Sequence, residues 1–173
     1  MDSVLNRRDL LKALTATAFT TLQLPAADAN VPLFFTNREF ALLDALTEMI
    51  VPADEHSPGA HEAGVAAYID RSVAEAFQPD EKSSWRKGLA SIDKKSEQMY
   101  HSPFLNASKE QQVNLLRELA AAEDKPETEP EKFFTQLKET TAFVYYSSSV
   151  GIHQDMNYKG NVVLEQFVGY DAT

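Results

Sequence analysis

The sequence predicts an all-α protein, with a single small domain of about five main helices that follows a cleaved signal peptide. Apolar residues recur at the three-to-four-residue spacing of a helix in five segments, and two of these segments begin with a capping-box sequence. No stretch of convincing length alternates between polar and apolar residues as a half-buried strand does. A helical domain is therefore the fold class that we expect.

The first helix is predicted over residues 37–51. Thr36 and Glu39 have the spacing of a capping box, in which each side chain satisfies a backbone N–H of the other residue. Pro52 ends the helix, and residues 52–61, which contain two prolines and a glycine, are expected to form a loop. The buried face of this helix should consist of Phe40, Leu43, Leu46, Met49 and Ile50.

A second helix is predicted over residues 62–77, and a third begins at Pro79, since proline suits the first turn of a helix. The apolar positions of the second helix are Val65, Tyr68, Ile69, Val73, Ala76 and Phe77. Those of the third helix are Trp85, Leu89, Ile92 and Met99. Both sets recur at helical spacing, so we expect them to face the core.

A fourth helix follows the capping box of Ser108 and Gln111, with Val113, Leu115, Leu116, Leu119 and Ala120 as its apolar positions. Residues 123–130 are acidic and contain two prolines, which indicates a surface loop within the same domain. The fifth helix is predicted from Glu131 to Ser148, although residues 143–146 have high β-propensity. Its apolar face comprises Phe133, Phe134, Leu137, Thr141, Val144 and Tyr145.

The first residues of the chain have the order of a twin-arginine export signal. Arg7 and Arg8 precede an apolar run over residues 13–24, and Ala27 and Ala29 supply the small-x-small pattern of a signal-peptidase site. The run is too short and too rich in threonine to span a hydrocarbon core, which needs about 20 apolar residues. We therefore expect residues 1–29 to be a cleaved signal, residues 30–173 to be the folded domain, and the mature protein to be periplasmic.

Export in the folded state usually serves proteins that bind a cofactor in the cytoplasm, yet the composition offers none here. The chain has no cysteine, which excludes thiolate metal sites, iron–sulfur ligation and covalent haem attachment. It also lacks the glycine-rich motifs of dinucleotide and phosphate sites. We therefore expect no cofactor and no metal in this chain, and a cofactor-carrying partner instead.

The net charge narrows the choice of partner. The charged residues of the signal cancel, so the whole net charge of −10 belongs to residues 30–173. Proteins bind nucleic acids and anionic membranes mainly through lysine and arginine. The negative net charge therefore argues against both as partners. The balance fits a neutral or basic protein partner.

Two groups of side chains leave other functions open. Asp54, His61 and Glu62 lie close together in the sequence and have the side chains of a small metal-dependent enzyme site. They also flank a Pro-Gly stretch and fit a solvated loop equally well. Tyr145 and Tyr158 could line the aromatic pocket of a stand-alone periplasmic ligand-binding module. Both alternatives compete with an accessory role.

Three stretches resemble the gluconate 2-dehydrogenase subunit 3 family. They are residues 42–54, residues 57–70 with Ser57-Pro58-Gly59-Ala60-His61-Glu62-Ala63-Gly64, and residues 134–161. The last stretch carries Phe134-x-x-Leu137-Lys138, then Tyr145-Tyr146-Ser147-Ser148, and Tyr158-x-Gly160-Asn161. The combination and order of these elements, over essentially the whole mature domain, make the resemblance specific.

The resemblance implies a small, non-catalytic subunit of a periplasmic dehydrogenase complex. The usual partner is a flavoprotein of the glucose-methanol-choline (GMC) oxidoreductase family, which carries FAD and oxidises a sugar, sugar acid or other polyol. A cytochrome c subunit with haem c often joins the complex, and membrane association comes through such partners. The small subunit commonly carries the only twin-arginine signal, so the flavoprotein crosses the twin-arginine translocase bound to it.

The aromatic residues near the C-terminus are the candidate partner interface. Phe134, Tyr145, Tyr146 and Tyr158 belong to an aromatic-rich part of the chain that fits either the core or an interface, because both environments favour these side chains. No residue is assigned a catalytic role.

Overall fold

The computed structural model describes residues 31–160, in which all regular secondary structure is helical. The elements in chain order are α2 (Asn37–Ile50), α3 (Val65–Glu75), α4 (Pro79–Tyr100), the short turn η1 (Phe104–Asn106), α5 (Lys109–Ala121), α6 (Glu129–Ser147) and the short turn η2 (Gly151–Asp155). The predicted all-α class with five main helices is confirmed. The division at residue 29 stays a prediction, because it lies outside the described residues. Within these residues, no helix combines the length and the apolar character needed to cross a membrane.

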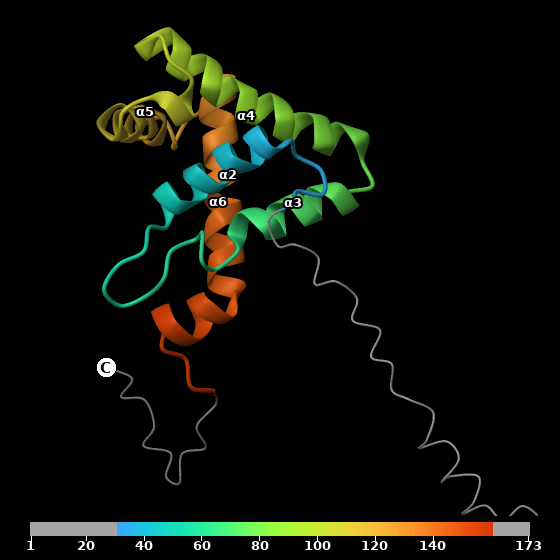
Figure 1. The fold of residues 1–173 in the computed structure, drawn as a ribbon, viewed down its shortest axis with the longest axis vertical. Helices are drawn as coiled ribbons and strands as arrows, with labels where there is room; N and C mark the ends of the chain where they lie inside the picture. Colours follow the sequence, from blue (N-terminus) through green and yellow to red (C-terminus); the bar gives the residue numbers. More distant parts are fainter. Residues whose placement is uncertain (1–30, 161–173) are drawn as a thin grey trace, which may run out of the picture.

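Helix α6 is the centre of the domain. Figure 1 shows it running vertically, with α4 across its upper part and α3 beside its middle, and α2, α3, α4 and α5 all contact it. Its inward positions are the ones that the sequence predicts, and the helix continues through residues 143–146 despite their β-propensity. Tertiary packing of an amphipathic face outweighs intrinsic propensity here. The buried residues of α6 are Phe133, Phe134, Leu137, Thr141, Val144 and Tyr145.

Capping boxes fix the starts of three helices. Those at Thr36 and Ser108 are confirmed: the Thr36 N–H donates to Glu39 at 2.8 Å, and the Ser108 N–H donates to Gln111 at 2.9 Å. A third box, formed by Thr128 and Glu131, starts α6 two residues earlier than predicted. Pro130 stands in the first turn, where a missing N–H costs nothing. The last residues of the acidic stretch 123–130 therefore form the first turn of α6.

Helix α3 is shorter than predicted, and its outer face is more exposed. Gly64 adopts a left-handed conformation with φ of 72°, so the helix begins only at Val65, and it ends at Glu75. Val65, Ile69 and Val73 are buried as expected. Tyr68 and Phe77, predicted to face the core, are 57% and 94% exposed. The spacing identified the helix, but it could not separate the core side from an apolar outer side.

Helix α4 packs tightly against α6 at Gly88. A Cβ atom placed on Gly88 would overlap the ring of Phe133, so only glycine allows this approach of the two helices. The Phe133 ring also meets Trp85 edge to face, with the ring centres 5.6 Å apart. Gly88, Trp85 and Phe133 are all buried, and together they fix α4 across α6.

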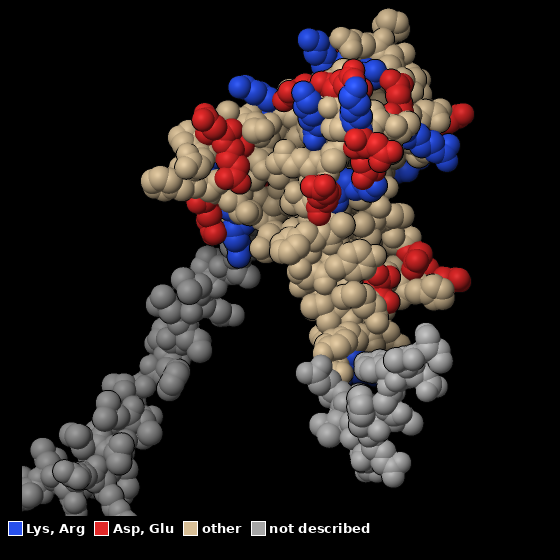
Figure 2. All heavy atoms as spheres, turned by 180° about the vertical axis from the view of Figure 1, so that it is seen from behind, with Lys and Arg blue, Asp and Glu red and all other residues tan. Residues whose placement is uncertain are grey.

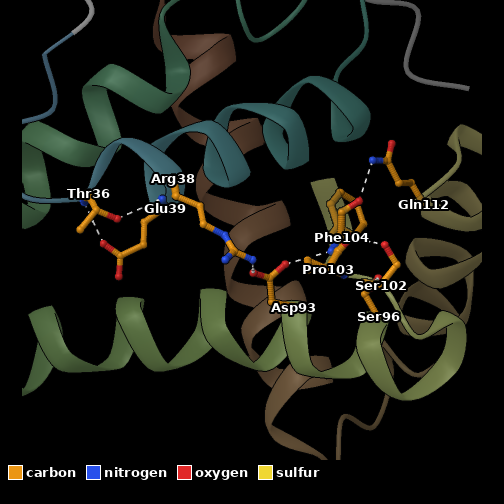
Figure 3. Close-up of polar contacts among 9 residues, drawn as sticks. All are labelled: Thr36, Arg38, Glu39, Asp93, Ser96, Ser102, Pro103, Phe104 and Gln112. Carbon is orange, nitrogen blue, oxygen red and sulfur yellow. Dashed lines mark hydrogen bonds and ion pairs between the residues drawn. The ribbon is translucent and has the colours of Figure 1, made fainter. Parts of the chain in front are cut away.

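Asp93 of α4 connects three elements through its carboxylate (Figure 3). One oxygen meets Arg38 of α2 at 2.8 Å, and the other accepts the backbone N–H of Phe104 in η1 at 3.0 Å. Gln112 of α5 donates to the Phe104 carbonyl at 2.8 Å. Phe104 is fully buried, so these bonds satisfy backbone groups of a residue that water does not reach.

Residues 33–35, which we call the N-terminal strap, are held by α3 and α4. The buried Asp70 accepts the backbone N–H groups of all three residues at 2.5–3.1 Å. Arg86 donates to the Phe34 carbonyl at 2.8 Å and lies 4.3 Å above the centre of the Phe34 ring. Three N–H donors compensate the cost of burying a carboxylate. The strap is thus a fixed part of the domain.

Replacing Gly88 by alanine is expected to destabilise the domain by up to about 2 kcal/mol. The gain in helix propensity, about 1 kcal/mol, is smaller than the cost of overpacking against Phe133, which is about 1–3 kcal/mol. Urea unfolding followed by circular dichroism measures the change. Ser84→Ala, at an exposed position of the same helix, should instead leave stability unchanged or raise it. Equal stability gains in both variants would contradict the tight contact.

The start of α6 should lose stability in acid through Glu131. Backbone N–H groups of Thr128 and Glu127 hold the pKa of Glu131 below its usual value of 4.5. The ionised carboxylate of Glu131 therefore contributes fully to the stability of the folded state above pH 4.5. This contribution is lost as the pH falls through the lowered pKa. Melting temperatures of the wild type and Glu131→Gln, measured across this range, should converge as the pH falls. A difference in melting temperature that stays constant with pH would contradict the hydrogen bonds to the Glu131 carboxylate.

Candidate interaction surface

The surface around the start of α3 and the end of α6 is poor in charge. Residues 140–154 contain no lysine, arginine, aspartate or glutamate, and neither do residues 63–69, although the chain as a whole has a net charge of −10. Figure 2 shows charged side chains gathered over the upper part of the view, whereas the lower part is mostly uncharged, with acidic side chains at its right edge. An uncharged area on an acidic protein is typical of an interface core, where charged residues are depleted.

A groove runs between α3 and α6 within this area. It consists of two adjoining hollows of about 490 and 250 Å³, and Tyr68, Phe143 and Val144 line both of them. The side chains of Tyr68 and Phe143 are 57% and 68% exposed, so two aromatic rings stand at the groove with much of their surface in water. We refer to this feature as the α3–α6 groove. Exposed aromatic rings beside a hollow are the usual anchors of protein recognition.

The two sides of the groove differ in chemistry. Arg71 of α3 lines the larger hollow, and within residues 31–160 its guanidinium makes no ion pair or hydrogen bond. Ser147 and Ser148 line the same hollow from the end of α6. The Ser148 hydroxyl is already bonded to the Tyr145 carbonyl at 2.6 Å. Glu81 lines the smaller hollow, and Arg71 is therefore the positively charged group that the groove offers to a carboxylate.

The four aromatic residues predicted as the interface divide into two pairs. Phe134 and Tyr145 are 4% and 1% exposed, so the structure places both in the core, and their part in the predicted interface is corrected. Tyr146 and Tyr158 are about half exposed and stay candidates. Asp155 contacts Tyr146, and its negative charge raises the pKa of the phenol above the usual 10.0. The helical spacing of Phe134 and Tyr145 with Leu137 and Thr141 was the signal for burial.

Tyr145 serves as an anchor between α6 and the loop of residues 52–61. Its hydroxyl donates to the Pro58 carbonyl at 2.7 Å and lies 3.0 Å from the Ser57 hydroxyl. Gly151 allows the chain after α6 to turn back, because a Cβ there would overlap the Tyr145 carbonyl. A ring so enclosed does not line an open pocket, which removes the observation behind a ligand pocket shared with Tyr158.

The polar residues considered as an enzyme site lie apart or serve the backbone. The Asp54 carboxylate accepts the N–H groups of Ser57 and His56, which lower its pKa. His61 contacts Asp44 of α2 at 2.7 Å, and Glu62 is exposed. Asp70, a further carboxylate in this part of the chain, is buried and bonded to the strap. Among residues 31–160, no three His, Cys, Asp or Glu side chains are grouped as a metal site requires.

The four residues predicted for export, Arg7, Arg8, Ala27 and Ala29, lie outside the described residues, so the signal and its cleavage stay predictions.

The sequence pattern did not reveal the α3–α6 groove. Phe143 was part of an aromatic-rich stretch, and Tyr68 was assigned to the core, but the register between two helices decides that they share a hollow. The absence of charge from residues 140–154 was the available signal.

Comparison with protein families matches the chain to the model of gluconate 2-dehydrogenase subunit 3 over residues 37–162. The chain belongs to this family. The matched range contains α2 to α6 and η2, and therefore both sides of the α3–α6 groove. Comparisons with curated proteins and with solved structures gave no match. As a member of the gluconate 2-dehydrogenase subunit 3 family, the chain has the role of a subunit in a multi-subunit dehydrogenase complex.

Tyr145→Phe is expected to destabilise the domain by about 1–2 kcal/mol, because the Pro58 carbonyl loses its donor in a buried place. The loop of residues 52–61 should exchange its amide hydrogens faster. Thermal unfolding and hydrogen exchange measure both effects. Tyr146→Phe is the matched control on the adjacent, half-exposed residue, and should change stability by less than about 0.5 kcal/mol. Equal effects of the two variants would contradict the anchor.

Proposed function

We propose that this chain is a non-catalytic small subunit that escorts the FAD-containing subunit of a dehydrogenase complex through twin-arginine export. The membership of residues 37–162 in the gluconate 2-dehydrogenase subunit 3 family is the observation that carries the proposal. Arg7 and Arg8, followed by an apolar run and by Ala27 and Ala29, support the export route. The partner is a GMC-type flavoprotein that oxidises a sugar, sugar acid or polyol in the periplasm, in some complexes with a cytochrome c subunit.

The division of labour follows from the composition of the chain. FAD in the partner supplies the oxidation of the alcohol group, and this chain contributes binding and positioning. A chain without cysteine and without glycine-rich phosphate motifs is suited to contact a cofactor-loaded protein rather than to load a cofactor. The uncharged surface around the α3–α6 groove supports the same assignment, since it offers an interface without the repulsion of a net charge of −10.

Escort and stabilisation have one physical basis. A protein that binds only the native state of its partner shifts the folding equilibrium of that partner, by about 2.7 kcal/mol when its free concentration is 100 times the Kd. The same contact carries a folded, flavin-loaded subunit to the translocase with a single signal. Maturation, stability and export of the flavoprotein are thus consequences of one interface.

Replacing Arg7 and Arg8 by lysine is expected to remove the flavoprotein from the periplasm together with this chain. The positive charge is kept, so the change tests the recognition of the arginine pair rather than the charge of the signal. The full chain, tagged at its C-terminus, is purified from the periplasm of the native host. Flavin absorbance, dye-linked dehydrogenase activity and mass spectrometry identify and quantify the partner.

The control replaces Lys12 by arginine, which alters the signal but leaves the arginine pair intact. It should leave export of both subunits unchanged. The proposal is wrong if the unaltered chain purifies without a flavoprotein. It is also wrong if deletion of the chain leaves an active flavoprotein in the periplasm, since the partner then needs no escort.

A further inference from the structure

The α3–α6 groove has the composition of a binding site. No segment of residues 31–160 fills it. Most apolar side chains of α3 and α6 are buried in the core, whereas Tyr68 and Phe143 expose more than half of their surface beside a hollow of about 490 Å³. Their placement costs hydrophobic free energy that a partner would recover, at roughly 25 cal/mol for each Å² covered. The groove therefore favours an apolar occupant.

The charge around the groove defines the occupant further. Residues 63–69 and 140–154 bring no charged side chain to it, so an occupant with many charges would lose hydration without gaining ion pairs. Two charged residues line the groove: Glu81 in the smaller hollow, and Arg71 in the larger hollow, where it has no partner within the described residues. A guanidinium at the edge of an apolar hollow is suited to a carboxylate, which it can bind through two hydrogen bonds.

We propose that the α3–α6 groove holds an apolar ridge of the flavin-containing subunit, and that a carboxylate of that subunit binds Arg71. The inference rests on the proposed function and adds the surface and the chemistry of its partner. Both helices lie inside the family match, which ends at residue 162, so the groove belongs to the part shared with a family of complex-forming subunits. The C-terminal residues 163–173 lie beyond that match.

A second copy of the chain fits the groove less well. A symmetric contact would bring two domains with a net charge of −10 together, and would set Arg71 near the same surface of its copy. Glu81 of the smaller hollow is then the groove carboxylate that could meet Arg71 of the copy, but the two net charges still repel each other. A partner with a different sequence need not bring this repulsion.

The test titrates full mature chain variants against the purified flavin-containing subunit, identified by the pull-down, using calorimetry. Phe143→Glu and Tyr68→Glu each put a charge into the groove at an exposed position, where the fold should tolerate it. Each should weaken binding at least about tenfold, which corresponds to about 1.4 kcal/mol. Phe77→Glu is the matched control, because Phe77 is 94% exposed and lines neither hollow of the groove.

Arg71 provides an independent measurement. Arg71→Glu should weaken binding about tenfold, Arg71→Lys should retain part of the affinity, and the effect of Arg71→Glu should shrink at high salt. Lys109→Glu makes the same change of charge at an exposed position on α5 and should leave binding unchanged. Circular dichroism melting curves accompany every variant, so a variant that fails to fold is replaced in the comparison by the other groove variants.

Four outcomes overturn the proposal. Equal binding by Phe143→Glu, Tyr68→Glu and Phe77→Glu shows that the groove is not the contact. A dimer of the mature chain that Phe143→Glu converts into a monomer assigns the groove to a second copy. Loss of binding on deletion of residues 161–173, with Phe143→Glu unaffected, assigns the contact to the tail. Absence of any flavoprotein with the unaltered chain overturns the proposed function itself, and is thereby distinct from the first three.

Discussion

The packing of α6 through the middle of the domain is the constraint on which the other features depend. One face of this helix is covered by α2, α3, α4 and α5, and its buried residues include Phe133, Leu137 and Tyr145. Once these positions face inward, the helical period turns Phe143 and Tyr146 outward. The core and the candidate interface are therefore two faces of the same helix, and neither can be altered without regard to the other.

Polar side chains then fix the segments that lie outside the five main helices. Asp70 holds the strap, Asp93 holds η1, and Tyr145 holds the loop of residues 52–61, in each case by accepting or donating a bond to backbone groups. Such bonds contribute modestly to stability when present but are costly to break, because a buried backbone group would be left unpaired. They explain how a domain with long loops keeps a defined surface.

The sequence predicted the parts of the structure that depend on local chemistry. Thr36 with Glu39 and Ser108 with Gln111 started two helices at the expected residues, since a capping box needs only neighbouring residues. Spacing also identified the buried face of α6. The third capping box, at Thr128, was missed because two prolines and four acidic residues suggested a loop.

The candidate site was less predictable because it depends on contacts between distant segments. Tyr68 and Phe77 share the apolar spacing of Ile69 and Val73, but the placement of α3 on α6 turns them outward. Tyr145 was assigned to an interface for its chemical type, whereas its hydroxyl is bonded to Pro58, a residue far away in the sequence. Amino-acid type alone does not separate an aromatic core residue from an aromatic interface residue.

On the proposed export route, the strap keeps the folded body close to the predicted cleavage site. Leu33 is the first residue held by Asp70, so only four peptide units separate the predicted cleavage site at Ala29 from the folded body. A fully extended chain of that length reaches about 14 Å. A peptidase at the membrane surface would thus work within one helix diameter or so of a rigid domain. On the proposed export route, the folded domain would therefore lie next to the membrane when the signal is cleaved.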